Sequence, residues 1–274
     1  MKLKIVYFFI LLVSGNVLAS VLESVKDPLL ETAKKSFNEN KFVGLSVLVM
    51  DGEGESFEFH IGHQDIEKQI KVTGETIYEL GSITKIFTRL ALASQNKIKL
   101  KDPISKFLPK NIRSPQPGGK EILIQDLMTH TGIKFSVPCT VRIADPENLI
   151  CFGFDIEDSA TNPYRDVTQN NLYDFVNEYS FTVDEYPLYF TEPGKYYSYS
   201  NVGFGLLGNF LGEQHESSFY SVLKENVLEP LSMDSTVMPM DCSQNILCPN
   251  LVKVYKKYED KDSWRNSSLW NLAS

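Results

Sequence analysis

The chain has 274 residues, enough for one large domain or for one domain with a sizeable insertion. Hydrophobic residues make up 42% and charged residues 23%, so the composition excludes a collagen, a coiled coil and wholesale disorder. The formal net charge of −8 argues against general nucleic-acid binding, because an acidic surface repels phosphate backbones. We therefore expect a folded protein with no nucleic-acid partner.

The first 19 residues have the pattern of a secretory signal peptide. A short basic region with Lys2 and Lys4 precedes an apolar run from Ile5 to Val13, and Ala19 ends a small-residue cleavage pattern. The alternative is a membrane anchor, but this run is shorter than the roughly 20 residues that a spanning helix needs. We expect cleavage of residues 1–19, a mature domain over 20–274 without an integral membrane span, and a periplasmic or secreted location.

Export would place the four cysteines in an oxidising compartment, where disulfides form. Cys139 is close in sequence to Cys151, and Cys242 is close to Cys248, so we expect these two local pairings. Free buried thiols are the alternative. A zinc site is less favoured, because neither pair has C-x-x-C spacing and no histidine lies beside either.

The first predicted elements are a helix, a hairpin and a second helix. Residues 27–38 have helical apolar spacing, and 43–50 and 56–61 read as strands joined by the turn residues Asp51 and Gly52. A helix is expected over about 82–95. Further along, we expect a short helix over 124–130 and a long loop over 136–170. Two more helices are expected, over 203–211 and 219–227.

The tetrapeptide S-x-x-K occurs three times, beginning at Ser82, Ser94 and Ser221. Residues i and i+3 of a helix share a face, so the lysine amine can reach the serine hydroxyl. A desolvated lysine can take the hydroxyl proton and so activate the serine as a nucleophile. Ser82, which is followed by Lys85, opens a helix after a hairpin, and a backbone N–H at a helix start can hold an oxyanion. The other two serines are expected at the surface.

A second chemical pattern is Tyr199-Ser200-Asn201, the only Y-x-N in the chain. A tyrosine coupled to a lysine can act as general base, and an asparagine beside it can hydrogen-bond a substrate amide. The alternative for Tyr199 is a core aromatic, because four other tyrosines crowd the same stretch. The chain contains neither G-x-S-x-G nor H-E-x-x-H. His60 and His63 would face opposite sides of a strand, so we expect no metal site.

Together these segments resemble class C β-lactamases and related penicillin-binding proteins. Residues 78–88, YELGSITKIFT, are similar to the family's active-site signature, and Tyr199-Ser200-Asn201 is similar to its second catalytic motif. Residues 100–104, LKDPI, 126–132, DLMTHTG, and 230–233, PLSM, resemble further family segments, in the family's order. The cysteine pair that follows residue 233 is similar to one in D-alanyl-D-alanine carboxypeptidase/endopeptidases of this group.

The resemblance implies an α+β fold, with an antiparallel sheet flanked by helices and a mostly helical subdomain. It also implies roles for four residues: Ser82 as the acylated nucleophile, Lys85 as its activator, Tyr199 as general base and Asn201 as the group that holds Lys85 and the substrate amide. The Ser82 backbone N–H would form half of an oxyanion hole. No metal or organic cofactor is implied.

The family's third motif, K-T-G or H-x-G, does not occur after Asn201. His130-Thr131-Gly132 precedes Tyr199 and belongs to the earlier DLMTHTG segment, so we do not assign it that role. We therefore expect a chain truncated at its C-terminus, without the C-terminal strands that would partner the 43–61 hairpin. By itself it would be weakly active or inactive, because losing one oxyanion donor costs about 10²–10³ in rate.

The resemblance implies a serine hydrolase that acts on D-Ala-D-Ala peptides of cell-wall muropeptides or on β-lactams. Carboxypeptidase, β-lactamase and esterase activities remain alternatives, because the fold does not dictate the substrate. A second hypothesis is a truncated, non-catalytic relative that binds peptidoglycan or protein.

Overall fold

A computed structural model of the chain describes residues 22–39, 42–134, 139–141, 149–151, 168–238, 248–258 and 261–267. The predicted signal peptide, Cys242 and the last seven residues lie outside these ranges. The chain divides into two compact units, one with residues up to Glu79 together with Pro239–Ser267, the other with Leu80–Met238 and Ser268–Ser274. We call them the sheet unit and the helical unit.

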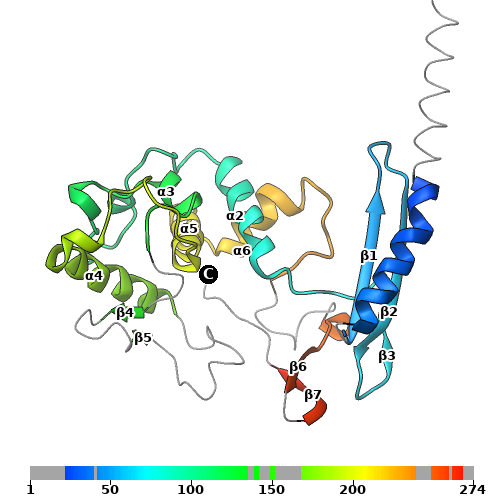
Figure 1. Cartoon of the computed structure of the whole chain (residues 1–274). Helices are drawn as coiled ribbons and strands as arrows, with labels where there is room; N and C mark the ends of the chain where they lie inside the picture. Colours follow the sequence, from blue (N-terminus) through cyan, green and yellow to red (C-terminus); the bar gives the residue numbers. More distant parts are fainter. Residues whose placement is uncertain are drawn as a thin grey trace, which may run out of the picture. The chain divides into compact units, whose positions relative to one another are not determined.

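The sheet unit begins with a helix over residues 22–39, followed by an antiparallel hairpin. Strands β1 (Gly44–Met50) and β2 (Ser56–Asp65) pair from Gly44 opposite Gly62 to Met50 opposite Ser56 (Figure 1). The Asp51 carboxylate closes the turn by accepting hydrogen bonds from the Glu53 and Glu55 amides, both at 2.9 Å. The expected helix and hairpin are confirmed in this unit.

The hairpin has a further strand that the sequence analysis did not anticipate. Strand β3 (Ile70–Lys71) pairs with β2, which gives a three-stranded sheet in the order β1-β2-β3. Strand β3 precedes the helical unit in sequence, so it is not one of the C-terminal strands that the sequence analysis expected to be missing. Two later strands of the unit, β6 (Val254–Tyr258) and β7 (Lys261–Ser267), form a separate antiparallel pair.

An ion pair network connects β2 to the segment before β6. The Lys253 ammonium lies 3.1 Å from an Asp65 carboxylate oxygen and 2.8 Å from Glu67. The Tyr255 hydroxyl accepts a hydrogen bond from the Ile66 amide at 3.0 Å. Segments almost 190 positions apart in sequence are thus joined within the sheet unit.

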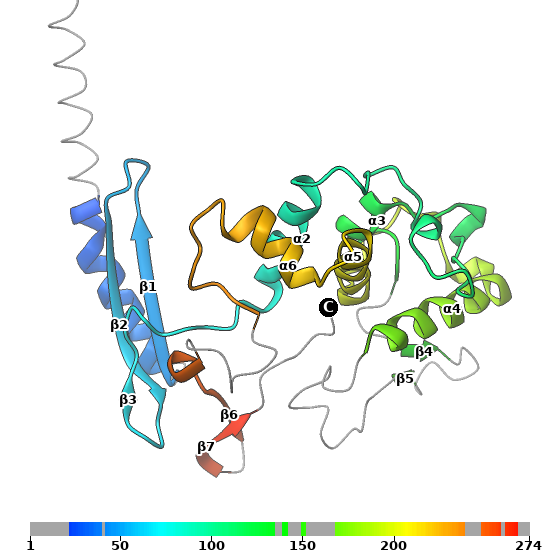
Figure 2. The same cartoon turned by 180° about the vertical axis from the view of Figure 1, so that it is seen from behind.

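In the described part of the helical unit, five α-helices surround one buried core (Figures 1 and 2). They are α2 (Thr84–Ala93), α3 (Ile124–Met128), α4 (Gln169–Glu185), α5 (Asn201–Gln214) and α6 (Phe219–Leu223), with a π-helical turn over Lys224–Leu228. Helix α5 contacts the other four. It buries residues on all sides, including Leu206, Leu207 and Phe210 at 0% exposure, so it forms the centre of the unit.

Helix α4 and one strand pair differ from the expectations. The whole of α4 was missed, although its buried residues Leu172, Phe175, Val176 and Val183 have helical spacing. Within the expected 136–170 loop, β4 (Cys139–Val141) pairs with β5 (Leu149–Cys151), so this part of the expectation is wrong. The register places Cys139 opposite Cys151, a backbone arrangement that a disulfide can span. The disulfide between Cys139 and Cys151 remains a prediction.

In the described ranges, no helix has both the length and the apolar character needed to cross a lipid bilayer.

Candidate functional site

The candidate nucleophile Ser82 lies where the chain enters its first helix in the helical unit. Gly81–Ile83 form a 3-10 turn that continues directly into α2. Gly81 has a φ of 51°, a left-handed conformation that favours glycine over residues with a Cβ. The Ser82 side chain is exposed, so its hydroxyl is accessible to a substrate.

Lys85 lies one helical turn after Ser82 and is almost fully buried, at 7% exposure. Its ammonium donates a hydrogen bond of 2.6 Å to the Asn201 side-chain oxygen and one of 3.4 Å to the Ser82 hydroxyl. A buried charge is costly unless it is hydrogen-bonded, and Asn201 supplies that partner. Asn201 therefore holds the ammonium beside Ser82.

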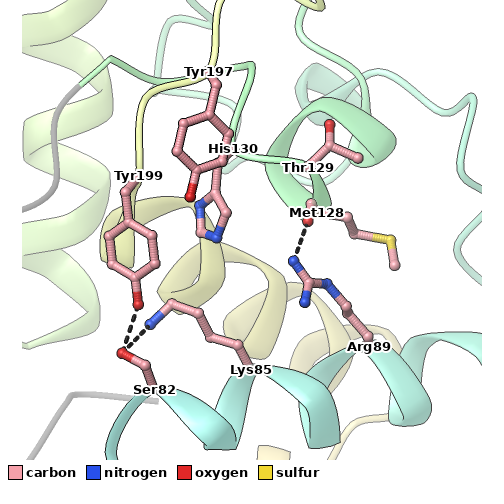
Figure 3. A pocket seen from close by; sticks show the side chains of 8 residues that line it. All are labelled: Ser82, Lys85, Arg89, Met128, Thr129, His130, Tyr197 and Tyr199. Carbon is pink, nitrogen blue, oxygen red and sulfur yellow. Dashed lines mark hydrogen bonds between the residues drawn. The ribbon is translucent and has the colours of Figure 1, made fainter.

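Tyr199 completes the cluster from a distant part of the chain. Its hydroxyl lies 2.5 Å from the Ser82 hydroxyl, and the Lys85 nitrogen lies 4.9 Å from the centre of its ring (Figure 3). Burial by itself would raise the pKa of Tyr199. The interactions with Lys85 and Ser82 and the charge of Arg89 outweigh that effect and lower the pKa below its usual value. A lowered pKa increases the fraction of Tyr199 in the anionic form, which is the form that can act as a general base.

The start of α5 fixes the positions of Tyr199 and Asn201. Ser200 is the N-cap of the helix, and its side chain accepts a hydrogen bond from the Gly203 amide at 3.1 Å. Tyr199 thus lies in the extended segment just before the helix, while Asn201 is the first helical residue. The Y-x-N spacing places the two side chains on either side of this cap.

His130 supports the same segment, and the sequence analysis did not include it in the site. Its ring nitrogen Nδ1 accepts a hydrogen bond from the Ser200 amide at 3.0 Å, and its carbonyl accepts one from the Ser198 amide at 2.7 Å. Its ring stacks on Tyr199, with 4.6 Å between ring centres. Burial lowers the pKa of His130, and the charges of Arg89 and Lys85 lower it further, so the neutral ring is favoured.

A pocket of about 560 Å³ opens beside these groups (Figure 3). Besides three of the predicted residues, it is lined by five that sequence reasoning missed: Arg89, Met128, Thr129, His130 and Tyr197. Three of the five, Met128, Thr129 and His130, belong to the DLMTHTG segment, so the resemblance itself contained a signal for them. Arg89 could have been found by its helical spacing from Lys85, since i and i+4 share a face.

The other S-x-x-K tetrapeptides have different partners. The Lys97 ammonium donates to the Gln214 carbonyl at 2.7 Å, and Lys224 lies 3.7 Å from a Glu229 carboxylate oxygen. Ser94 is exposed, as expected, whereas Ser221 is half-buried. Within the described ranges, Ser82 is the one S-x-x-K serine that accepts a hydrogen bond from its lysine. Those ranges also contain no group of three or more His, Cys, Asp or Glu side chains suited to a metal ion.

The sequence of the chain is similar to those of several known proteins. Residues 27–133 match the family model described as Beta-lactamase. Protein flp of Staphylococcus aureus (strain COL) is 26% identical over 196 residues, which cover 70% of this chain and 34% of that protein. A protein named Beta-lactamase from Providencia stuartii is 26% identical over 216 residues, which cover 77% of this chain and 46% of that protein.

The fold has counterparts among solved structures. The octameric penicillin-binding protein homologue from Pyrococcus abyssi matches with a TM-score of 0.66 and 22% identity, covering 88% of this chain and 50% of that one. The chain thus spans about a third to a half of the length of these relatives.

Proposed function

We propose that the chain, whose residues 27–133 match the family model described as Beta-lactamase, acts as a serine hydrolase through an acyl-Ser82 intermediate. Its substrates would be D-Ala-D-Ala cell-wall peptides or β-lactams, met in the periplasm or outside the cell. The observation that carries the proposal is the placement of the Ser82 hydroxyl 2.5 Å from Tyr199 and 3.4 Å from Lys85.

In the acylation step, the Ser82 oxygen forms a bond to the substrate carbonyl carbon and transfers its proton to Tyr199. The carbon–nitrogen bond of the peptide or lactam then breaks, and the departing nitrogen takes a proton from Tyr199. The positive charge of Lys85, which Asn201 holds in place, stabilises the anionic form of Tyr199 that takes the Ser82 proton. The Ser82 amide would stabilise the oxyanion, and water would later release the acyl group by the reverse proton path.

Intact-protein mass spectrometry after incubation with a penicillin tests the proposal. We expect an adduct of one penicillin per chain that peptide mapping places on Ser82 and that Ser82→Ala abolishes. Ser94→Ala is the matched control, because Ser94 also begins an S-x-x-K tetrapeptide but its hydroxyl bonds to the Ala91 carbonyl of its own helix. Circular dichroism on each sample shows whether the variant is folded.

A non-catalytic, peptidoglycan- or protein-binding relative is the second candidate. Such a binding role would not need the K-T-G or H-x-G motif, which does not follow Asn201 in the sequence. A folded protein that forms no adduct with the penicillin would support this candidate and contradict the acyl-enzyme proposal. Retention of the chain on insoluble peptidoglycan, unchanged in Ser82→Ala, would support it further.

A further inference from the structure

The pocket contains a second cation besides Lys85. Arg89 follows Lys85 by one turn of α2 and lines the same cavity. One of its terminal nitrogens donates a hydrogen bond of 2.7 Å to the Met128 carbonyl, and the guanidinium lies 4.9 Å from the centre of the Phe204 ring. These contacts hold the charge at the pocket wall. A guanidinium has five N–H donors, and the described residues account for one of them with this bond.

No carboxylate neutralises this pair of cations within the described part of the chain. Neither Asp nor Glu is among the eight residues that line the pocket, and Arg89 forms no salt bridge with a described residue. Within the same described residues, Lys85 donates hydrogen bonds to the side-chain oxygens of Ser82 and Asn201, neither of which is a carboxylate. The pocket therefore carries a local positive charge, although the chain as a whole has a formal net charge of −8.

Two neighbouring groups respond to this charge. After burial, the charges of Arg89 and Lys85 are the causes that lower the pKa of His130. The same two cations contribute to the lowered pKa of Tyr199. The positive potential thus extends from the wall at Arg89 to the candidate catalytic groups.

We propose that Arg89 is a specificity-determining residue that selects substrates with an anionic group on the part of the molecule that enters this pocket. The inference rests on the proposed acyl-Ser82 chemistry for its meaning in catalysis. Arg89 follows Ser82 by two helical turns, about 10 Å along the axis, so the anion belongs to a part of the substrate remote from the reacting carbonyl. A carboxylate there would accept the unused guanidinium donors, an interaction stronger than a neutral hydrogen bond.

A pair of matched esters tests the selection. Mono-p-nitrophenyl adipate carries a distal carboxylate, and its methyl ester replaces that carboxylate with an uncharged ester one methyl group larger. We expect kcat/KM of the whole chain to be roughly ten- to hundredfold higher for the anionic ester, the range of a charged hydrogen bond. Arg89→Gln retains an amide donor for the Met128 carbonyl but removes the charge, so the ratio between the two esters should fall toward one. Arg89→Lys should keep a ratio above one.

An alternative role for Arg89 is purely structural, as a tie between α2 and α3. A structural role would change both esters by the same factor in Arg89→Gln and would leave their ratio unaltered. An equal rate for the two esters in the unaltered chain, or an unaltered ratio in Arg89→Gln, overturns the proposal. The ratio separates selection from stability, because loss of folded protein lowers both rates together.

A binding measurement separates this inference from the proposed function. An NMR titration compares 4-nitrobenzoate with 4-nitrobenzamide, which are similar in size and differ in charge. We expect tighter binding of the anion by about tenfold or more, and loss of that preference in Arg89→Gln. If no penicillin adduct forms on Ser82 while this preference is found, the acyl-Ser82 proposal fails and the anion site stands. Equal binding of the two ligands, or no binding of the anion, overturns the anion site.

Discussion

His130 is buried to 6% exposure among cations and aromatic rings, and its neutral form makes the contacts that place Tyr199. Its Nδ1 atom can accept the hydrogen bond from the Ser200 amide only while that nitrogen carries no proton. Lys85 and Arg89 face the ring from α2, and Tyr199 and Phe204 face it from the start of α5. Protonation would therefore cost the bond and place a third positive charge in the pocket.

This arrangement predicts a dependence of stability on pH. The pKa of His130 is lowered in the folded chain, so below the ordinary histidine pKa of about 6.5 the unfolded chain binds more protons than the folded one. The contribution of His130 to stability is thus complete above about pH 6.5 and declines as the pH falls toward the folded pKa. Urea unfolding measures the free energy of unfolding at each pH between 8 and 5. As the pH is lowered, this free energy should fall less in His130→Gln than in the unaltered chain.

Comparing how much stability the unaltered chain and His130→Gln lose at low pH separates the effect of His130 from that of other titratable groups. The pKa of His215 is also lowered, mainly by burial, and the pKa of Asp126 is raised by burial, so both add their own pH dependence. The Asp126 effect has the opposite sign, because the folded chain then binds more protons below the raised pKa. Both effects are common to the two chains. Identical declines in both would contradict the role assigned to His130.

At this scale, motif spacing predicted the residues that act on a bond and missed those that support them. Ser82 and Lys85 share a helix, and Tyr199 and Asn201 share a cap, so local geometry was enough to connect each pair. The meeting of the two pairs required the fold, because 117 positions separate Ser82 from Tyr199. Arg89 was missed because its effect depends on which side chains of α3 and α5 it faces.

The N-cap of α5 fixes the positions of the site residues Tyr199 and Asn201, which lie on either side of the capping residue Ser200. The Ser200 side chain is 2% exposed and satisfies the Gly203 amide, which has no carbonyl partner within the first turn. Ser200→Ala removes the cap and leaves that donor buried. We expect a loss of about 1 kcal/mol in the free energy of unfolding, with a range of about 0.5–2.

Ser200→Ala should also slow the reaction at Ser82, because Tyr199 and Asn201 flank the capping residue and would be held less firmly. Urea unfolding measures the stability, and the rate of penicillin adduct formation measures the site. Ser200→Asp is the matched variant, since aspartate is also a strong N-cap residue and should lose less stability than alanine. Equal stability of Ser200→Ala and the unaltered chain would show that the cap contributes nothing to α5.

Elements with a clear apolar period were predicted, and those stabilised by tertiary contacts were not. The 43–50 and 56–61 strands alternate or carry β-branched residues, and the turn at Asp51 has its own chemistry. In α4 the apolar residues are separated by polar and aromatic ones, which obscured a 17-residue helix. Strand β3 has two residues, too short for any pattern, and forms because β2 offers an unpaired edge.

At the scale of the whole molecule, the buried apolar side chains among the described residues are distributed unevenly between the two units. The buried cluster runs from Ala91 to Leu228 and lies in the helical unit. Among the described residues of the sheet unit, Val72 is the one hydrophobic side chain that is buried, while Leu48 and Met50 of β1 are 60% and 61% exposed. Burial of apolar area is the main favourable contribution to folding. The described strands of the sheet unit therefore receive less stabilisation from apolar burial than the helices of the helical unit.

We therefore expect amide hydrogen exchange to distinguish the two units. After correction for intrinsic rates, peptides from β1 and β2 should exchange at least about tenfold faster than peptides from α5, because local opening costs least where few apolar contacts are lost. Leu207→Ala provides the internal control. It truncates a side chain at 0% exposure and should cost about 2–5 kcal/mol in the helical unit.

If the units open independently, this substitution speeds exchange in α5 and leaves β1 and β2 at their original rates. Equal protection of β1 and α5 in the unaltered chain would contradict the argument from buried area. It would mean that hydrogen bonds and ion pairs such as Lys253–Asp65 stabilise the sheet as effectively as apolar burial stabilises the helices. That result would be unexpected, because an ion pair with one partly exposed member contributes about 1 kcal/mol or less.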